Sequence, residues 1–360
     1  MSSLLIQSST HDYEVAIGSG IRGRVEEILD KDYQKVLIIT DSQVADLYLQ
    51  QVIEGFSPKG QVGTAVVPAG EASKSMEQYQ YLLDVCVEER LDRKSLIIAL
   101  GGGMIGDLAG FAASTYLRGI DFVQMPTTIL AHDSSVGGKV AINHPQGKNL
   151  IGSFYNPVHV IYDMETLSSL SPAEVRSGYG EVVKHGLLSD PKWLDELLQQ
   201  DLTQLSKDQI AKDLAKGIRV KANLVEQDER EAGVRKYLNL GHTLAHSIEA
   251  ELGYGDITHG EAVAIGIWFA LKLSKKKFQT DLPVKDYVNW IIRNHFPVDK
   301  LNKLDCNSLI NRMKRDKKTV HEVINYVLLT DTGFPCIEPL QDEELLQELN
   351  DFLKEVRRHD

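Results

Sequence analysis

The sequence predicts an α/β amino-terminal domain, with a Rossmann-like and mostly parallel sheet, followed by an all-α carboxy-terminal domain. Three observations lead to this fold class. Short β-rich runs alternate with helical segments in the first half of the chain, a pattern typical of a parallel sheet covered by helices. From about Ser171, apolar residues recur every three or four positions, and strand signals nearly vanish apart from Val323–Leu329. We therefore expect a boundary near 165–172, and assign 1–168 to the α/β domain and 169–360 to the helical domain.

The individual elements follow from the same patterns. Strands are predicted at Tyr13–Gly18, Lys35–Asp41, Gly63–Ala69, Ser95–Gly101, Asp121–Thr128 and Val158–Asp163. Helices of the first domain are predicted at Val44–Glu54, Ser73–Arg90 and Met104–Leu117. Helices of the second domain are predicted at 172–188, 191–205, 207–230, 236–251, 260–276, 283–295, 305–315 and 342–358.

Composition restricts the classes of partner. The 360 residues carry a formal net charge of −12, which argues against nucleic acid and membrane surfaces because both attract basic faces. Met1–Asp12 lacks the features of a signal peptide, and the longest apolar run, Ala262–Leu271, is too short to span a bilayer. Cys86, Cys306 and Cys336 are scattered and lack CxxC spacing, which favours a cytoplasmic protein with buried, unpaired thiols.

A histidine-rich segment near the middle of the helical domain predicts a metal site. His242 and His246 share one helical face, and His259 opens the next helix after a glycine-containing turn. Upstream, Glu181 and Lys184 also share a helical face. Two histidines and a carboxylate on separate helices suit a catalytic zinc ion with one open position. The structural alternative is a polar helix face with a histidine at a helix start, and the combination of residues makes us prefer the metal.

A glycine-rich turn in the first domain predicts a nucleotide cradle. The strand ending at Leu100 runs into GGGMIGD (101–107), where a helix begins and its backbone N–H groups can face a phosphate. Two further features lie at the same edge of the sheet. One strand ends there at Asp41, and the loop that carries Glu71 and Lys74 follows the end of another strand. A tight turn without ligand would also explain the glycines, but the companion residues favour a nucleotide, and a dinucleotide over a mononucleotide.

A cationic, glycine-rich arm follows the sheet. Two glycine–lysine pairs, ending at Lys139 and Lys148, flank a short β-like segment, and Arg118 precedes them. Further cations and an amide, Lys184, Lys221, Arg235 and Asn239, lie on or beside the helices with the metal candidates. Each could be a solvated surface residue, but together they predict a pocket for a doubly anionic small molecule. Two like charges about 4 Å apart cost roughly 4 kcal/mol at an effective dielectric of 20, so we expect an open empty state and domain closure on binding.

The ordered set of motifs closely resembles the 3-dehydroquinate synthase family of the sugar-phosphate cyclases, over nearly the whole chain. The motifs are GEASK, GGGMIGDLAGFAAS, PTTILAHDSSVGGK, NHPQGKNLIGSFYNP, SGYGEVVKHG, LNLGHTLAH, THGEAVAIG and MKRDKK. One run, TTILAHDSS, is a residue shorter than the commoner form of the family. The resemblance implies a dehydroquinate synthase-like fold, an NAD-binding first domain and a metal- and substrate-binding second domain.

The resemblance also implies residue roles. Zinc, or cobalt in its place, would be held by Glu181, His242 and His259. NAD would contact Asp41, Glu71, Lys74, Gly102, Gly103, Asp107, Thr127, Thr128, Lys139, Lys148, Ser169 and Leu170. The catalytic groups would be His246, Lys139, Asn149, Lys184, Asp133 and Glu231. Substrate would also be bound by Lys148, Lys221, Arg235, Asn239, one of Lys317 and Lys318, with Lys317 preferred, and Arg118, which reaches the neighbouring subunit of a homodimer.

The implied reaction belongs to the shikimate pathway, which leads to the aromatic amino acids. It converts 3-deoxy-D-arabino-heptulosonate 7-phosphate to 3-dehydroquinate and phosphate. NAD transiently oxidises the C5 hydroxyl, which acidifies the C6 proton; phosphate elimination, reduction, ring opening and intramolecular aldol closure follow. His246 would move the hydroxyl proton, and the substrate phosphate itself would take the C6 proton. Two alternatives remain open: a related sugar-phosphate cyclase, and a metal-dependent NAD polyol dehydrogenase.

Overall fold

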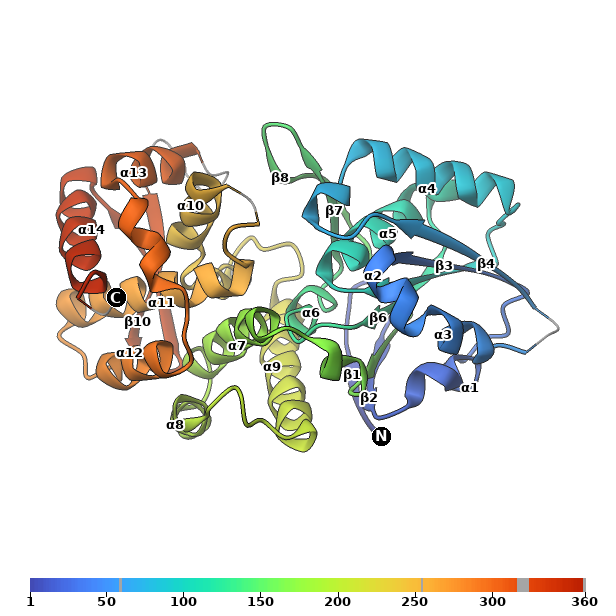
Figure 1. Ribbon diagram of the computed structural model, residues 1–360, viewed down its shortest axis with the longest axis horizontal. Coiled ribbons are helices and arrows are strands. Elements are labelled where there is room, and N and C mark those ends of the chain that lie inside the picture. The colour runs from blue at the N-terminus through green and yellow to red at the C-terminus, as the bar shows by residue number, and fades with distance from the viewer. Residues whose placement is uncertain (58–59, 254, 316–323, 359–360) are drawn as a thin grey trace. The chain divides into compact units, whose positions relative to one another are not determined.

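The computed structural model describes residues 1–57, 60–253, 255–315 and 324–358, and is drawn in Figure 1. The chain forms two compact units. The first consists of Met1–Leu170 together with Lys207–Arg230, and the second of Ser171–Ser206 together with Glu231–Asp360. The two units are considered separately below.

The first unit is built around a seven-stranded sheet. Across the sheet the order is β1 (Ser2–Ile6), β2 (Tyr13–Gly18), β9 (His159–Asp163), β6 (Asp121–Pro126), β5 (Leu96–Gly101), β3 (Lys35–Asp41) and β4 (Gln61–Val67). Only the pairing of β1 with β2 is antiparallel, and all other neighbours are parallel. The six predicted strands therefore form one mostly parallel sheet, as the alternation of strands and helices predicted.

Helices cover both faces of this sheet because successive strand residues point to opposite sides. The helices of the unit are α1 (Val25–Ile28), α2 (Ser42–Val44), α3 (Gln50–Glu54), α4 (Met76–Glu88), α5 (Gly103–Thr115), α6 (Ala131–Ser134) and α9 (Lys207–Gln227). Leu37 and Ile39 pack on the side of α4 and α5, whereas Val36 and Ile38 pack on the other side with α3 and the segment before it.

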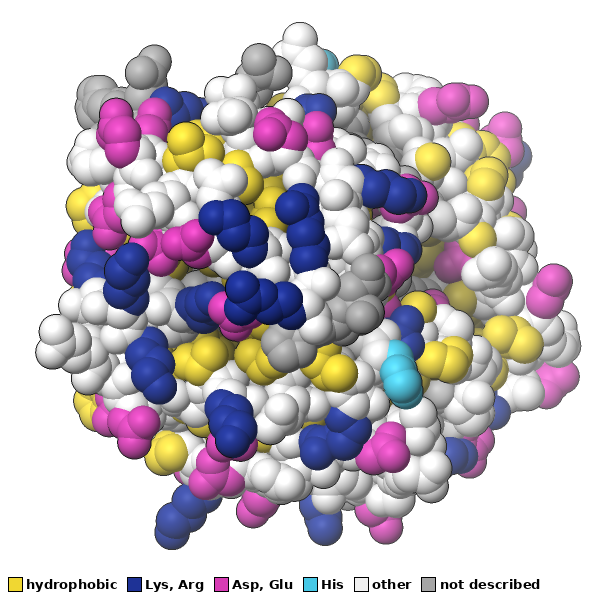
Figure 2. Space-filling model, turned by 60° about the vertical axis from the view of Figure 1, so that its left-hand side comes forward, with side chains coloured by type: hydrophobic (Ala, Val, Ile, Leu, Met, Phe, Trp, Pro, Cys, Tyr) yellow, Lys and Arg dark blue, Asp and Glu magenta, His cyan; other side chains and the backbone are white. Residues whose placement is uncertain are grey.

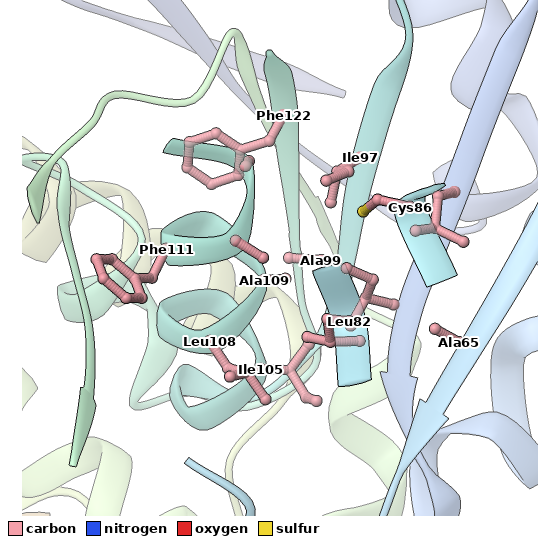
Figure 3. Close-up of a cluster of buried hydrophobic side chains, with 14 of the residues drawn as sticks. Ala65, Leu82, Cys86, Ile97, Ala99, Ile105, Leu108, Ala109, Phe111 and Phe122 are labelled. Atoms are coloured by element: carbon pink, nitrogen blue, oxygen red, sulfur yellow. The ribbon is translucent and has the colours of Figure 1, made fainter. Parts of the chain in front are cut away.

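The core under α4 and α5 is shown in Figure 3. Leu82 and Cys86 of α4 and Ile105 and Leu108 of α5 lie against strand side chains such as Ile97, and all five are fully buried. Buried side chains of this size each stabilise the fold by roughly 1.5–3 kcal/mol. This packing fixes the start of α5, and therefore the glycine turn that precedes it.

Among its described residues, the second unit is helical except for one hairpin. Its helices are α7 (Pro172–Leu187), α8 (Pro191–Gln199), α10 (His242–Leu252), α11 (His259–Phe278), α12 (Val284–Arg293), α13 (Cys306–Arg315) and α14 (Asp342–Val356). The hairpin pairs β10 (Ile324–Asp331) with β11 (Phe334–Leu340). Both strands of the hairpin pack beside η6 (Val234–Asn239), and β10 also packs against α11. α11 is the central helix of the unit, since most of its residues are buried, including Trp268 and Phe269.

One predicted helix belongs to a different unit from the one expected. The sequence prediction assigned 207–230 to the second domain, but α9 packs against β1, β2 and α6 of the first unit. The amphipathic period of α9 predicts that one face is buried, and it says nothing about which neighbour covers that face. Lys221 is therefore carried by the first unit and not by the helices that bear the metal candidates.

Three strands were not predicted as strands: β1, β11 and β8 (Gly147–Phe154). β8 forms a small separate sheet with β7 (Lys139–His144), which covers the predicted β-like segment of the arm. β7 and β8 form an antiparallel hairpin with an irregularity between Ile142 and His144. β8 contains glycine and asparagine, which are depleted in strands, and its side chains are largely exposed. The predicted cationic arm is thus a hairpin.

The surface carries mixed charge. Figure 2 shows one face of the molecule, on which Lys and Arg side chains are interspersed with those of Asp and Glu. The basic end of α11 is one such region, because Lys276 pairs with Glu348 and Lys277 pairs with Glu338. In the described part of the chain, no helix is both long enough and apolar enough to cross a membrane.

Candidate metal centre and nucleotide cradle

Three side chains from three helices of the second unit converge on one point. Glu181 Oε1 on α7 lies 3.4 Å from His242 Nε2, at the start of α10, and 3.5 Å from His259 Nε2, at the start of α11. Zinc bonds to nitrogen and oxygen are about 2.0–2.2 Å long, so tetrahedral angles put ligand atoms about 3.4 Å apart. The two distances from Glu181 therefore match what a single divalent ion requires, and the three donor atoms all lie within 4.8 Å of one another.

Glycines permit this convergence by letting the three helices touch through their backbones. A β-carbon on Gly260 would lie 1.7 Å from the Ser177 carbonyl oxygen, and one on Gly180 would lie 2.1 Å from the Gly260 carbonyl oxygen. At the next crossing, a β-carbon on Gly266 would lie 2.1 Å from the Gly241 carbonyl oxygen. α7, α10 and α11 are thus held at separations that no larger residue would allow.

The first turn of α11 is held by a capping box that also contacts α7. Thr258 and Glu261 cap each other, and Glu261 Oε1 accepts a hydrogen bond of 2.8 Å from Arg176 Nε on α7. The Gly260 N–H donates to Ser177 Oγ at 3.1 Å. Because these bonds flank His259, they fix the backbone from which its ring projects.

The centre combines opposite charges in a buried place. Glu181 and Lys184 are each only 1% exposed and form an ion pair of 2.5 Å. Burial would raise the pKa of Glu181, but Lys184 and His242 together hold that pKa well below its usual range. Burial would lower the pKa of His259, whereas the charge of Glu249 and the hydrogen bond that His259 donates to Glu181 raise it to about 10. In the metal-free protein the centre is therefore a network of alternating charges.

His246, the third histidine of the segment, stands beside the other two. Its ring centroid is 5.5 Å from that of His242 and 5.9 Å from that of His259, with the last two rings stacked. His246, Glu249 and His259 form a second group whose donor atoms lie within 4.8 Å of one another. Glu249 was missing from the predicted residues, although it lies seven residues after His242 and so on the same helical face.

The polar segment before α10 gathers further predicted residues. Asn239 Nδ2 donates to Glu231 Oε1 at 2.7 Å. Arg235, in the same η6 turn as Asn239, is 1% exposed. Glu231 has a left-handed backbone with φ of 59°, which costs a non-glycine residue energy and points to a constrained position.

The first unit brings the glycine turn together with the threonines that were predicted near it. Gly102 caps the start of α5, and a β-carbon there would lie 3.1 Å from the Thr128 side chain. The Thr127 N–H donates to the Gly101 carbonyl oxygen at 3.0 Å. A β-carbon on Gly103 would lie 3.0 Å from Ser134 Oγ. The side chains of Thr128 and Ser134 therefore lie close around the start of α5, the nucleotide cradle, where the helix has its first backbone N–H groups.

Three predicted residues meet beside this cradle. Lys74 Nζ lies 2.5 Å from Asp107 Oδ2 and 2.5 Å from Asn149 Oδ1, and its side chain is 5% exposed. Burial raises the pKa of Asp107, although the charge of Lys74 opposes the shift. The arrangement joins the loop after β4, the helix α5 and the hairpin through one ammonium group.

Asn143 is a residue that the sequence prediction did not assign. Its N–H donates to the Lys74 carbonyl oxygen at 2.8 Å, and its Nδ2 donates to Glu71 Oε1 at 2.8 Å. Its Oδ1 accepts from the Asn149 N–H at 3.0 Å. Asn149 is held there with a left-handed φ of 55°. Asn143 therefore ties the predicted NAD loop to the predicted substrate arm.

The two lysines of the arm lie towards opposite ends of the hairpin. Lys139 pairs with Phe154 at the open end, whereas Lys148 follows Gly147, which pairs with His144 at the turn. Four to five strand residues separate the two positions, which corresponds to roughly 14–17 Å along the strand. The two ammonium groups are thus carried by separate positions of the arm.

Asp133 and Lys221 meet although they are far apart in the sequence. Lys221 Nζ lies 3.1 Å from Asp133 Oδ2 and also donates to the Asp133 carbonyl oxygen. Asp133 lies in α6, the short helix formed by the shortened TTILAHDSS run, and Lys221 lies in α9. The pairing follows from the packing of α9 on the first unit.

The remaining predicted residues do not take part in the contacts described above. Asp41 Oδ1 accepts from the N–H groups of Gln43 and Val44 and so caps α2. Arg118 is exposed, at a turn where it and Leu117 both have left-handed φ. Ser169 and Leu170 end the turn after β9, where Ser169 Oγ donates to the Thr166 carbonyl oxygen. Lys317 and Lys318 lie outside the described residues.

Known proteins are similar to this chain over nearly its whole length. Two family models, 3-dehydroquinate synthase N-terminal and C-terminal, match residues 64–177 and 178–319. The 3-dehydroquinate synthase of Oceanobacillus iheyensis is 47% identical over 99% of this chain and 100% of its own length. That of Halalkalibacterium halodurans is 48% identical over 97% of both chains.

Among solved structures, 2-deoxy-scyllo-inosose synthase in complex with carbaglucose-6-phosphate, NAD+ and Co2+ is similar to this chain. The TM-score is 0.89 at 27% identity, with 97% of this chain and 100% of that chain covered. The family models cover most of the sequence, and the curated relatives are matched over nearly their full length. The chain belongs to the 3-dehydroquinate synthase family.

Proposed function

We propose that this protein converts 3-deoxy-D-arabino-heptulosonate 7-phosphate to 3-dehydroquinate and phosphate. The observation that carries the proposal is the convergence of Glu181, His242 and His259 at the spacing of a single divalent ion. It is supported by the match to 3-dehydroquinate synthases at 47% and 48% identity over nearly the full chain. The reaction is a phosphate-eliminating cyclisation, and it belongs to the shikimate pathway.

Glu181, His242 and His259 would hold zinc, or cobalt with the same ligands. The donor set of two imidazoles and a carboxylate, from three helices, suits a catalytic ion with an open position. The bound ion would supply Lewis acidity to a substrate oxygen. Lys184, buried against Glu181, would donate to the substrate beside the ion, and His246 would move the proton of the C5 hydroxyl.

The first unit would hold NAD. Gly102 and Gly103 offer the start of α5 to phosphate, as helix N-termini commonly do. Thr127, Thr128, Glu71, Lys74 and Asp107 surround that start, and Asp41, Ser169 and Leu170 would contact the rest of the cofactor. Bound NAD+ would supply reversible hydride acceptance, so that one cofactor molecule serves repeated turnovers.

The anionic ends of the substrate would be bound by the remaining cations and amides. Asn149, Lys139 and Lys148 of the hairpin would hold the phosphate, where it can accept the C6 proton. Lys221, Arg235 and Asn239 would bind the carboxylate and hydroxyls, with Asp133 and Glu231 ordering them through the contacts described above. Arg235 is fully buried, and a buried guanidinium is well suited to a bidentate contact with a carboxylate.

A related sugar-phosphate cyclase is the second candidate, because the similarity to 2-deoxy-scyllo-inosose synthase covers 97% of this chain. A substrate of that class without a carboxylate would not make the contact proposed above for Arg235. A metal-dependent polyol dehydrogenase is the third candidate. It would accumulate one NADH for each substrate oxidised, whereas a cyclase returns the hydride.

A phosphate-release assay tests the proposal. Purified protein with trace NAD is given the heptulosonate phosphate, glucose 6-phosphate or sedoheptulose 7-phosphate, with and without a chelator. We expect phosphate from the heptulosonate phosphate alone, many turnovers per NAD, and loss of activity on chelation that zinc or cobalt reverses. Turnover of another sugar phosphate, or stoichiometric NADH, would reassign the reaction.

We also propose that the enzyme is a cytoplasmic homodimer. The support is the exposed position of Arg118 at the left-handed turn before β6, and three thiols that form no disulfide. Light scattering on the purified protein measures the subunit number. If Arg118 serves a neighbouring subunit, mixing inactive Arg118→Ala and inactive Glu181→Gln chains should restore part of the activity through hybrid dimers.

A further inference from the structure

We infer that Glu249 is a positioning residue for the metal centre: its carboxylate accepts the Nδ1 proton of His259 and so directs Nε2 of that ring towards Glu181 and His242. The inference rests on the proposed function, because it assigns a role at the metal site that the function requires. It adds to that site a residue that is not itself a ligand in the proposed set.

The contact has hydrogen-bond length and is partly buried. His259 Nδ1 lies 3.0 Å from Glu249 Oε2, and the Glu249 side chain is 4% exposed. The carboxylate comes from α10, the same helix that carries His242, whereas His259 starts α11. Burying a carboxylate is costly unless it is hydrogen-bonded, so its position next to an imidazole N–H indicates a specific partnership.

The two ligand histidines are oriented by different acceptors. His242 Nδ1 lies 3.2 Å from the Leu240 carbonyl oxygen, in the turn that immediately precedes α10. His259 has Glu249 in the corresponding place. Both rings therefore have an acceptor at Nδ1, and both present Nε2 to Glu181 at 3.4–3.5 Å. This similarity supports the same role for Glu249 and the Leu240 carbonyl oxygen, namely to orient the histidine ring.

An acceptor at Nδ1 determines which tautomer the His259 ring adopts. A neutral imidazole has one N–H, and an acceptor at Nδ1 fixes that proton there and leaves the lone pair of Nε2 for a metal. A carboxylate at this place also increases the basicity of the ligand nitrogen. His259 needs such support more than His242 does, because its side chain is 32% exposed against 11% for His242.

A second ion is the competing interpretation of Glu249. His246, Glu249 and His259 have donor atoms within 4.8 Å of one another and could in principle share a metal. That site would need Nδ1 of His259 as a ligand while Nε2 serves the first ion, so the imidazole would have to lose both protons. The orienting role needs only the neutral ring, and it predicts one ion per chain.

Three variants of the full-length protein test the role. Glu249→Ala removes the acceptor, and Glu249→Gln keeps an accepting oxygen without the charge. Glu251→Gln is the matched control, because Glu251 lies two residues further along α10 and pairs with Arg312 instead. Each variant is checked for folding by circular dichroism and thermal unfolding before zinc affinity is measured against a competing chelator.

We expect zinc affinity to fall by about 10- to 100-fold in Glu249→Ala, less in Glu249→Gln, and not at all in Glu251→Gln. The visible absorption of the cobalt-loaded protein should change in Glu249→Ala, because the ring is no longer held. Folded Glu249 variants with wild-type affinity and spectrum would overturn the inference. Two zinc ions per wild-type chain, with one lost in Glu249→Ala, would overturn it in favour of the second ion.

A measurement on the wild-type protein does not depend on how the variants fold. Long-range ¹H–¹⁵N spectra of the zinc-loaded protein report which nitrogen of His259 carries the proton, and we expect Nδ1. A proton on Nε2 would overturn the inference while leaving the proposed reaction intact. Zinc that fails to bind the wild-type protein at all would overturn both.

Discussion

The metal centre and the nucleotide cradle are built in opposite ways. The candidate metal ligands project from three helices whose backbones touch at Gly180, Gly260 and Gly266, so their positions are fixed by the main chain. In the cradle, Lys74 reaches Asp107 and Asn149 with a long side chain from a loop. The difference teaches that rigid backbone is used where three atoms must meet within tenths of an ångström. Flexible side chains are used where a large ligand must enter and leave.

The largest effect should come from Glu181→Gln. The substitution removes a proposed metal ligand and leaves Lys184 buried without its ion-pair partner, which typically costs about 3–5 kcal/mol. We expect loss of zinc binding and turnover, together with a lower melting temperature of the metal-free protein. Glu27→Gln is the control, because the Arg24–Glu27 pair is exposed and such pairs contribute little. Zinc affinity that survived in Glu181→Gln would remove Glu181 from the ligand set.

Gly260→Ala tests whether the backbone crossing sets the geometry. The added β-carbon would lie 1.7 Å from a carbonyl oxygen, so α7 and α11 must move apart. Overpacking of this kind costs about 1–3 kcal/mol, and zinc affinity should fall in parallel as Glu181 and His259 separate. Gly23→Ala is the comparison, because a β-carbon there would meet the Gln51 carbonyl oxygen at 3.8 Å, an ordinary contact. Unchanged zinc affinity in a folded Gly260→Ala protein would contradict the rigid-backbone account.

Lys74→Met tests the cradle in the same manner. It removes a charge-assisted donor, which is worth about 1.5–3 kcal/mol, so NAD affinity should weaken by roughly ten- to a hundredfold. Zinc affinity should not change, because Lys74 belongs to the other unit. Both affinities can be measured by calorimetry on the same preparation. A change in zinc affinity alone would contradict the assignment of Lys74 to the nucleotide cradle.

The pH dependence of metal binding should reflect His259. Its pKa is raised to about 10 in the metal-free protein, against a usual 6.5, whereas a zinc ligand must be neutral. Zinc affinity should therefore rise between pH 6.5 and 10, by up to about tenfold per pH unit for one displaced proton. The protonated ring stabilises the metal-free fold fully below pH 6.5, and this stabilisation is lost as pH rises to 10. Zinc titrations across that range, with proton release measured in two buffers, check both.

The smallest effect should come from Asn143→Ala. The substitution removes the side-chain bonds to Glu71 and to the Asn149 N–H, but keeps the backbone bond to Lys74. Loss of a hydrogen bond costs about 0.5–1.5 kcal/mol, so NAD and substrate affinities should each weaken by a few-fold. Steady-state KM values for both ligands measure this. A change in only one of them would show that Asn143 does not tie the two loops together.

Residue types and helical spacing were sufficient to single out Glu181, His242 and His259 as candidate metal ligands, and the structure brings their donor atoms within 4.8 Å of one another. Glu249, Asn143 and the Arg176–Glu261 pair act through other side chains, and their partners become apparent only when the helices are packed. The same limit applies to the fold. The buried strands β3 and β5 have continuous apolar runs, which predict strands from sequence. β1 and β8 are largely exposed, and their extended conformation depends on pairing with an adjacent strand.

The return of α9 to the first unit has a consequence for how the protein can be divided. The chain passes from one unit to the other after Leu170, after Ser206 and after Arg230, so three covalent crossings join them. A fragment that stops near residue 170 would lack the helix that covers β1 and β2 and the lysine that pairs with Asp133. Severing a single crossing would leave two peptide connections in place. Each unit of this enzyme is therefore discontinuous in sequence, and cleaving the chain at one position cannot yield either unit complete.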